Sequence, residues 1–525
     1  MNSKNRTFLY VAAGLVVLLI VAAIGVNVYV HGLGPKARQR VIRALQDRFD
    51  ANVQLKSLDL EIFPHPSITG EGLTIAYRNW PADHPLIAIR RFSADASISD
   101  LFWQRDKVSE VNLEGLQIHI PPHGAAKEVM GTGTEQPGAD NTTLRIEIEK
   151  IVADGTLLEI EPKKAGKDPL QYEIQRLTLY SASADTRMTF RAQLVNAKPP
   201  GLINSNGTFG PWQKDEPRTT PVGGKYTFTD ADLSVFKGIS GMLSSTGSYN
   251  GVLEHIEVDG TTDTPNFALK RGGAPVHLKT KFHSTVNGTD GETVLEPVDA
   301  SFLSSEFICR GGIVKLNGQK AKTVDLDATT RNARMEDILT LVMGDKQPIL
   351  TGAVDFRSKI VIPPGQEDVL DKLELDGKFK ILSAHFTSPK VAQNLDTLSD
   401  RARGISKDEQ AELPRQEVAS NLLGTFRLDR GVASFSHLSF EVPGATIRLA
   451  GDYNLRTQSI DMAGVFRMQA TLSDTQSGWK ALLLKPLDPL FKKNGAGFEV
   501  PLKLGGDRHH PEVSVDVFHH TFTLK

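Results

Sequence analysis

KLELDGKFKI, residues 372–381, decides the fold class, because apolar and polar side chains alternate along it. Leu373, Leu375, Phe379 and Ile381 fall on one side, and lysine, glutamate and aspartate fall on the other. Side chains of a β-strand point alternately to opposite faces of its sheet. This stretch therefore predicts a strand with one apolar face and one wet face.

The same alternation recurs along the chain, with turn residues between the repeats. It places further apolar residues on one face at 144–150, at 354–362 and at 447–455: Leu144, Ile146, Ile148, Val354, Phe356, Ile360, Ile447 and Leu449. Few helical patterns interrupt these strands. We therefore expect a mostly β protein, in which an N-terminal transmembrane helix precedes a long, twisted antiparallel sheet. The sheet is expected to curl into an elongated groove, with a few short helices near its C-terminal end.

Several strands change phase at a glycine. In VNLEGLQIHI (111–120) the apolar set moves from one parity to the other across Gly115. EGLTI (71–75) and EGLQI (114–118) echo each other, and DGTLLEI (154–160) is a looser echo. Phase slips of this kind predict β-bulges, which add twist to a sheet.

An apolar segment near the N-terminus is long enough to span a bilayer. Residues 8–30 are apolar apart from Asn27, and a helix of this length rises roughly 35 Å. Residues 36–50 predict a short amphipathic helix just outside the membrane. Positive charges flank the segment on both sides, so the charge rule does not orient it. The β-rich body with one cysteine favours an exported orientation.

Three later segments have helical periodicity. RMEDILTLV (334–342) and VAQNLDTLSDRA (391–402) predict short helices, the second with Val391, Leu395 and Leu398 on one apolar face. WKALLLKPLDPLFKK (479–493) predicts two, because Pro486 and Pro489 interrupt it. Its apolar face consists of Trp479, Leu482, Leu483, Leu487, Leu490 and Phe491. This face could touch a membrane, cap the end of a groove, or simply pack on the last strands.

Composition and motifs argue against several functions. The net charge of −2 provides no basic field for nucleic acid. Cys309 is the single cysteine, so no internal disulfide and no CxxC metal site can form. No P-loop, nucleophile elbow or HExxH motif occurs. We expect no enzyme activity, no cofactor and no bound metal.

A long sheet with one apolar face must hide that face. It can pack on a second sheet, be covered by helices, or remain open to apolar ligands. Helical segments are few, so full cover by helices is not expected. Two readings stay open from periodicity alone: an open apolar groove, and a pair of closed β-sandwich domains.

The chain resembles the AsmA-like family, which is similar to bridge-like lipid-transfer proteins with a repeating β-groove. The resemblance rests on an entry segment at 41–78, a middle at 258–269 and 281–307, and a C-terminal block at 422–467 and 484–516. These motifs are structural and not catalytic. The resemblance implies a bacterial inner-membrane anchor, a body in the periplasm, and movement of phospholipid for outer-membrane lipid homeostasis.

The expected organisation follows from these elements. It comprises a cytoplasmic tail (1–7), a transmembrane helix (8–30), a juxtamembrane helix (31–52), a groove region (53–384) and an AsmA-like C-terminal domain with capping helices (385–525). The apolar residues named above at 144–148, 354–360, 373–381 and 447–449 are the candidates for lipid contact. Membrane phospholipid is the expected partner, with outer-membrane or other periplasmic proteins as further partners. The rival hypothesis is a periplasmic assembly factor with closed β cores that recruits outer-membrane proteins by strand addition.

Overall fold

The computed structural model describes most of the chain from residue 51 to residue 524. Gaps fall at 62–66, 78–84, 86, 96–106, 121–146, 161–169, 183–185, 212–218, 271–272, 289–290, 317–320, 344–347, 406–418, 472, 476–484, 486–496, 508–509 and 518–519; residues 38–39, 42–43 and 46 are also described. The predicted transmembrane helix and most of the predicted juxtamembrane helix lie outside the described residues. Within them, none of the helices has the length and apolar character needed to span a membrane.

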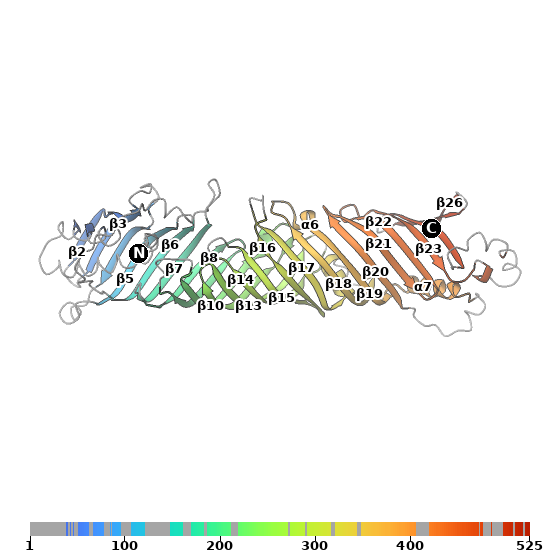
Figure 1. Cartoon of the computed structure of the whole chain (residues 1–525), viewed down its shortest axis with the longest axis horizontal. Helices are drawn as coiled ribbons and strands as arrows, with labels where there is room; N and C mark the ends of the chain where they lie inside the picture. The colour runs from blue at the N-terminus through green and yellow to red at the C-terminus, as the bar shows by residue number, and fades with distance from the viewer. Residues whose placement is uncertain are drawn as a thin grey trace, which may run out of the picture. The chain divides into compact units, whose positions relative to one another are not determined.

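The described chain is mostly β, as the alternation predicts, and its helices are few and short. It divides into two compact units. Unit 1 comprises Met1–Asp232, Leu243–Thr261 and His283–Thr293, and unit 2 comprises Leu233–Met242, Thr262–Phe282 and Val294–Lys525. Figure 1 shows both as curled sheets of neighbouring strands.

Strands of unit 1 pair mainly with their neighbours in the chain. They are β1 (Ala51–Gln54), β2 (Ser57–Glu61), β3 (Ser67–Tyr77), β4 (Ile87–Asp95), β5 (Lys107–Ile120), β6 (Glu147–Ile160), β7 (Leu170–Ala182), β8 (Met188–Ala197), β9 (Pro200–Phe209) and β10 (Pro221–Asp232). Short β1 and β2 both pair with β3. The strands that follow are β11 (Ile239–Ser240, after the 3₁₀ turn Leu233–Val235), β12 (Met242–Val252), β13 (His255–Leu269), β14 (Val276–Val286) and β15 (Thr293–Phe302).

The expectation of a wholly antiparallel sheet is wrong for the described strands β5 and β6. Strands β5 and β6 are parallel, with Val111 opposite Ile151 and Leu113 opposite Ala153. A parallel pair needs a long connection, since the chain must return to the starting end of the first strand. Residues 121–146 supply that connection. Strand alternation alone says nothing about direction, and therefore the parallel pair was not predicted.

The glycines of the three echoed motifs are aligned across strands β3 to β6 of unit 1. Gly72, Gly115 and Gly155 all have positive φ, at 64°, 63° and 67°. Before each glycine one alternate set of residues faces the core, and after it the other alternate set does. All the strands change together, so the pairing of β4 with β5 keeps one register across this line. The phase changes predicted from the sequence are therefore real, but they occur at glycines in the left-handed conformation and without a shift of register between β4 and β5.

We expect Gly115→Ala to destabilise unit 1 more than Gly155→Ala does. Both changes force an alanine into the left-handed region, which costs about 1–2 kcal/mol. A Cβ at Gly115 would also lie 3.0 Å from the Cβ of Arg90, whereas a Cβ at Gly155 meets no atom within 4 Å. Hydrogen exchange of the β5 and β6 amides, followed by mass spectrometry, measures the difference. Equal destabilisation would show that the contact with Arg90 has no effect.

Unit 2 continues with strands paired in chain order (Figure 1). They are β16 (Ser305–Val314), β17 (Thr323–Arg334), β18 (Leu350–Ile362), β19 (Glu374–Phe386), β20 (Ser420–Asp429), β21 (Val432–Val442), β22 (Ala445–Asn454), β23 (Ile460–Met468), β24 (Phe498–Gly506), β25 (Pro511–Val517) and β26 (His520–Leu524). All the pairs from β16 to β26 are antiparallel. A 3₁₀ turn, Ser473–Thr475, follows β23.

Among the described residues of unit 2, three short helices connect strands. Helix α5 (Met335–Met343) joins β17 to β18, and α7 (Pro389–Ala402) joins β19 to β20. Because β17 and β19 run in the same direction, both helices lie at the same end of the strands. Both confirm helices predicted from periodicity. Helix α6 (Val369–Lys372) joins β18 to β19 at the opposite strand ends from α7 (Figure 1).

The strand predicted at 372–381 begins later than its alternation implies. Asp368 caps the short helix α6 by accepting a hydrogen bond from the backbone N–H of Leu370, 2.9 Å away. Leu373 is the C-cap residue of this helix, and β19 begins at Glu374. Leu373 is therefore not a strand residue, although it is half-buried.

Candidate functional site

Strands β18 to β21 present one apolar face, whose rows follow from the register. Phe356 on β18 lies opposite Phe379 on β19, and Phe379 lies opposite Gly424 on β20. One row further, Phe426 on β20 lies opposite Phe435 on β21. The side chains between them in sequence, such as Arg357 and Lys378, belong to the other, polar face.

Four phenylalanine rings meet on this apolar face: Phe356, Phe379, Phe426 and Phe435, here called the phenylalanine cluster. The Phe426 ring is central, with centroid distances of 6.1 Å to Phe356, 6.2 Å to Phe379 and 6.3 Å to Phe435. These distances lie within the range of favourable aromatic pairs. Four adjacent strands thus contribute one continuous aromatic surface.

A glycine makes room for this surface. The Phe379 ring lies over Gly424, where an added Cβ would collide with the ring. All four rings remain only half-buried, while a closed core buries such rings almost completely. Half-buried aromatic rings on a continuous face are the feature that an apolar ligand could cover.

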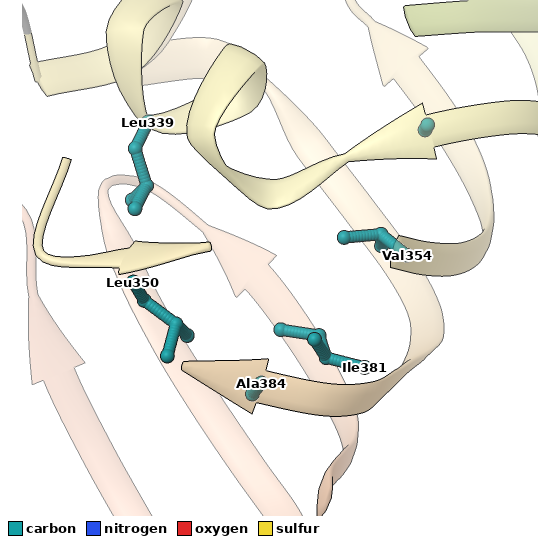
Figure 2. Packing of buried hydrophobic residues seen from close by; sticks show 6 residues of the cluster. Leu339, Leu350, Val354, Ile381 and Ala384 are labelled. Carbon is teal, nitrogen blue, oxygen red and sulfur yellow. The ribbon is translucent and has the colours of Figure 1, made fainter. Parts of the chain in front are cut away.

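At the strand ends next to α5, side chains of the protein itself cover the same apolar face. Leu339 of the helix packs with Leu350, Val354, Ile381 and Ala384 in a buried cluster, and Figure 2 shows these side chains directed toward one another. Ile381 is completely buried there, at 0% exposure.

Helix α7 closes a second cluster at the same edge. Ala402 packs with Val442, Ala445 and Met468, and the partly buried Leu395 and Leu398 of the helix, Phe440, Phe466 and Phe498 pack against them. Leu395 and Leu398 belong to the apolar face predicted for this helix. The two helices thus fill one edge of the sheet and leave the phenylalanine cluster beyond them half-exposed.

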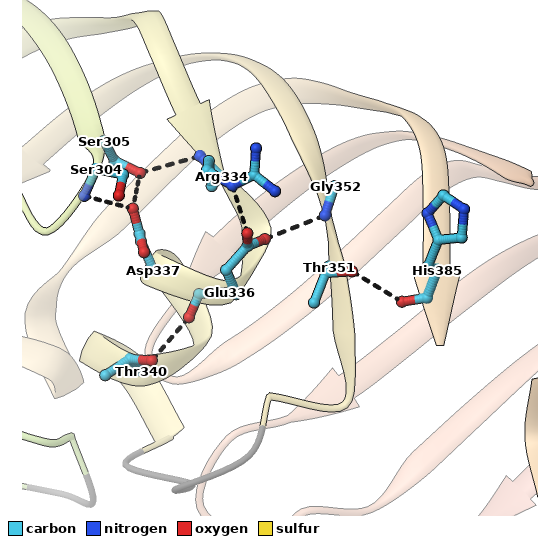
Figure 3. Close-up of polar contacts among 9 residues, drawn as sticks. All are labelled: Ser304, Ser305, Arg334, Glu336, Asp337, Thr340, Thr351, Gly352 and His385. Carbon is cyan, nitrogen blue, oxygen red and sulfur yellow. Dashed lines mark hydrogen bonds and ion pairs between the residues drawn. The ribbon is translucent and has the colours of Figure 1, made fainter. Parts of the chain in front are cut away.

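A buried polar network fixes α5 to the strands (Figure 3). The Asp337 carboxylate is buried and accepts hydrogen bonds from the Ser304 backbone N–H at 2.9 Å and from the Ser305 hydroxyl at 2.8 Å. The Ser305 Oγ in turn accepts from the backbone N–H of Arg334, 3.0 Å away. The turn before β16 is thereby tied to the first turn of α5.

Glu336 ties the same helix to β18. Its carboxylate accepts hydrogen bonds from the Arg334 guanidinium and from the Gly352 backbone N–H, the latter at 3.1 Å. Burial alone would raise the pKa of Glu336. Hydrogen bonds from its own backbone N–H, from Arg334 and from Gly352 outweigh burial and hold that pKa below its usual value. The ionised carboxylate is therefore the form that the helix start stabilises.

The apolar face of unit 1 differs, because its early strands form a dry core. Leu73, Ile89, Phe92, Val111 and Ile151 are each at most 1% exposed. These five residues therefore offer no half-exposed apolar surface, whereas Leu179 of β7, opposite Ile151, is half-buried.

Apart from Leu373, which is the C-cap residue of α6, the predicted lipid-contact residues fall into three groups. Half-buried on the apolar face of unit 2 are Phe356, Ile360, Leu375, Phe379, Ile447 and Leu449. Buried in cores are Val354 and Ile381 in the α5 cluster and Ile148 in unit 1. Leu144 and Ile146 lie outside the described residues, as do all six members of the predicted capping face, Trp479, Leu482, Leu483, Leu487, Leu490 and Phe491.

Sequence reasoning missed half of the phenylalanine cluster. The alternation of Leu422, Gly424, Phe426 and Leu428 would have placed Phe426 on the apolar face. Phe435 was harder to place, since the β21–β22 register shifts between Phe435 and Leu438. A shift of this kind breaks the period of two that the prediction relied on.

The fold and the site define a class of protein: a curled β-sheet whose apolar face, among the described residues of unit 2, is covered by helices α5 and α7 at one end of the strands. In comparison with known proteins, the sequence matches no family model and no curated protein.

Proposed function

We propose that this chain is a lipid-transfer protein that holds phospholipid acyl chains on the apolar face of its sheet. The half-exposure of the phenylalanine cluster is the observation that carries the proposal. An acyl chain laid on these rings leaves water, which contributes about 0.8 kcal/mol per buried CH₂ group. The charged head group stays at the wet edge of the face.

Transfer along such a face needs no covalent step. A lipid that moves from one apolar row to the next stays in an apolar environment, so its free energy changes little. Half-buried residues next to the cluster, Leu438 and Leu449, extend the apolar rows across β21 and β22. The filled edge under α5 and α7 bounds the rows on one side.

The proposal also includes a cellular localisation. An apolar segment at residues 8–30 would anchor the chain in a bacterial inner membrane, with its body in the periplasm. This arrangement matches the resemblance to AsmA-like proteins and gives the sheet access to membrane phospholipid. Outer-membrane lipid homeostasis is the process that such transfer would serve.

Bound lipid is the first expected result. The full chain, purified in a mild detergent, should retain phospholipid that mass spectrometry detects after extraction. Cys309 provides a local probe, because it lies opposite Ala328 on the apolar face of β16 and is half-buried. Burial raises the pKa of its thiol, so labelling is expected to be slow at neutral pH.

A photoreactive group attached to Cys309 should crosslink to phospholipid. A matched control carries the same group on the wet face, in a Cys309→Ala, Ser434→Cys chain. Crosslinking that is equal from the two positions, or absence of co-purified lipid, would contradict the proposal.

The alternative is an assembly factor with closed β cores, and the dry core of unit 1 favours it. In the described chain β26 pairs with β25 alone, so its other edge could accept an added strand. This alternative predicts a protein partner at β26 and no bound phospholipid, so the same extraction separates the two.

A further inference from the structure

Behind the phenylalanine cluster, the polar face of β18 to β21 contains a hollow of about 430 Å³. It is lined by Asp355, Arg357, Lys378, Phe379, Lys380, Leu423, Gly424, Thr425 and His437, here called the basic hollow. The register of β20 with β21 shifts between Thr425 and Phe426, at the position of the hollow. A bulge bends and twists its strand locally.

The cations of the hollow face one another across the strands. Arg357 on β18 lies directly opposite Lys378 on β19, and Lys378 lies opposite Thr425 on β20. Thr425 lies opposite His437 on β21, which completes the row. In the neighbouring row, Lys380 lies opposite Asp355. Two like charges directly opposite each other destabilise an antiparallel pair.

The hollow leaves these cations without protein partners. Within the described residues, the side chains of Arg357, Lys378 and Lys380 form no ion pair and no hydrogen bond. Nearby cations on the same face do find carboxylates: Lys359 pairs with Asp325 at 3.3 Å, and Arg331 pairs with Asp299 at 2.9 Å. Three permanent cations and one carboxylate leave the hollow with excess positive charge.

We propose that the basic hollow binds a phosphate group. A guanidinium donates two parallel hydrogen bonds to phosphate oxygens, and a lysine ammonium adds a point charge. Arg357 and Lys378 supply these two groups, while Thr425 and His437 line the same hollow. A bound phosphate would also relieve the repulsion between Arg357 and Lys378. The cations lie on the face opposite the phenylalanine cluster, and Phe379 is the one residue that the cluster and the hollow share. Phosphate binding by these cations does not require the proposed lipid transfer.

Titration of the full chain with inorganic phosphate tests the proposal, at constant ionic strength in sodium chloride. The wild-type chain should show saturable binding by calorimetry. An Arg357→Gln, Lys378→Gln chain should bind phosphate at least about tenfold more weakly, because it loses charge-assisted hydrogen bonds. In phosphate-free buffer this variant should be at least as stable as wild type, since the substitutions remove a like-charge contact.

An Arg448→Gln, Lys503→Gln chain is the matched control. Both residues are exposed cations on the polar face outside the hollow, and the net charge changes by the same amount. This control should retain wild-type affinity. Equal weakening in both variants would mean general attraction of anions, and absence of saturable binding to wild type would likewise overturn the proposal.

Competition identifies the source of the phosphate group. Soluble glycerol phosphate should displace inorganic phosphate from the hollow. Vesicles containing phosphatidic acid should displace it as well if the natural ligand is a lipid head group, and should leave it bound if the ligand is a soluble phosphate ester. Failure of glycerol phosphate to compete would contradict a phosphate site.

Discussion

A Leu375→Asp, Phe379→Asp chain is expected to lose its bound phospholipid while its sheet stays folded. Both side chains are half-buried on the apolar face of β19, and Phe379 belongs to the phenylalanine cluster. An acyl chain laid over them would desolvate two carboxylates, which costs several kcal/mol. We expect co-purified phospholipid, measured by mass spectrometry per mole of protein, to fall by roughly tenfold or more.

The control for this change places the same charges on the other face. Ser434 and Ala450 are exposed on β21 and β22, where their side chains point away from the phenylalanine cluster. A Ser434→Asp, Ala450→Asp chain should keep its lipid. The groove hypothesis would fail if the Leu375→Asp, Phe379→Asp chain remained folded and retained lipid at the wild-type level.

Removal of the Asp337 carboxylate is expected to release α5 from the sheet. In an Asp337→Ala chain the Ser304 N–H and the Ser305 hydroxyl both lose a charged acceptor in a buried place. Hydrogen bonds to charged groups contribute about 1.5–3 kcal/mol each, so we expect a loss of about 3 kcal/mol locally. Hydrogen exchange of the α5 amides, followed by mass spectrometry, should accelerate roughly a hundredfold.

Thr340→Val is the comparison for this helix. The Thr340 hydroxyl donates only to the Glu336 carbonyl one turn earlier, so its loss should change the exchange of α5 by much less. If exchange of α5 is unchanged in the Asp337→Ala chain, the buried network does not hold the helix. Hydrogen exchange is the appropriate measurement, since a chain of two units need not unfold in a single step.

The sequence predicted features that depend on local pattern. Period two placed Phe356, Leu375 and Phe379 on one face of neighbouring strands, and the register confirms that face. Helical spacing predicted α5 and α7, and the buried cluster around Ala402 uses the apolar face expected of α7. These features follow from side-chain periodicity within single elements.

Features that depend on distant residues were not predicted. Asp337 lies in an ordinary first helical turn, and nothing near it in sequence indicates that Ser304 and Ser305 supply its donors. The basic hollow needs Arg357, Lys378 and His437 to fall in one row across β18 to β21. Strand register becomes known only when the turns and bulges between strands are known.

The parallel pairing of β5 with β6 sets a lower limit on the length of the segment that connects them. The pairs Lys107–Glu147 and Ile120–Ile160 align the two strands along their full length, so the chain must travel back along the whole of β5. That distance is about 45 Å at roughly 3.3 Å per residue. About 13 extended residues could cover it, and residues 121–146 provide twice that length. A connection of about half that length would still allow the parallel pair, whereas a hairpin-sized connection would force β6 to run the other way.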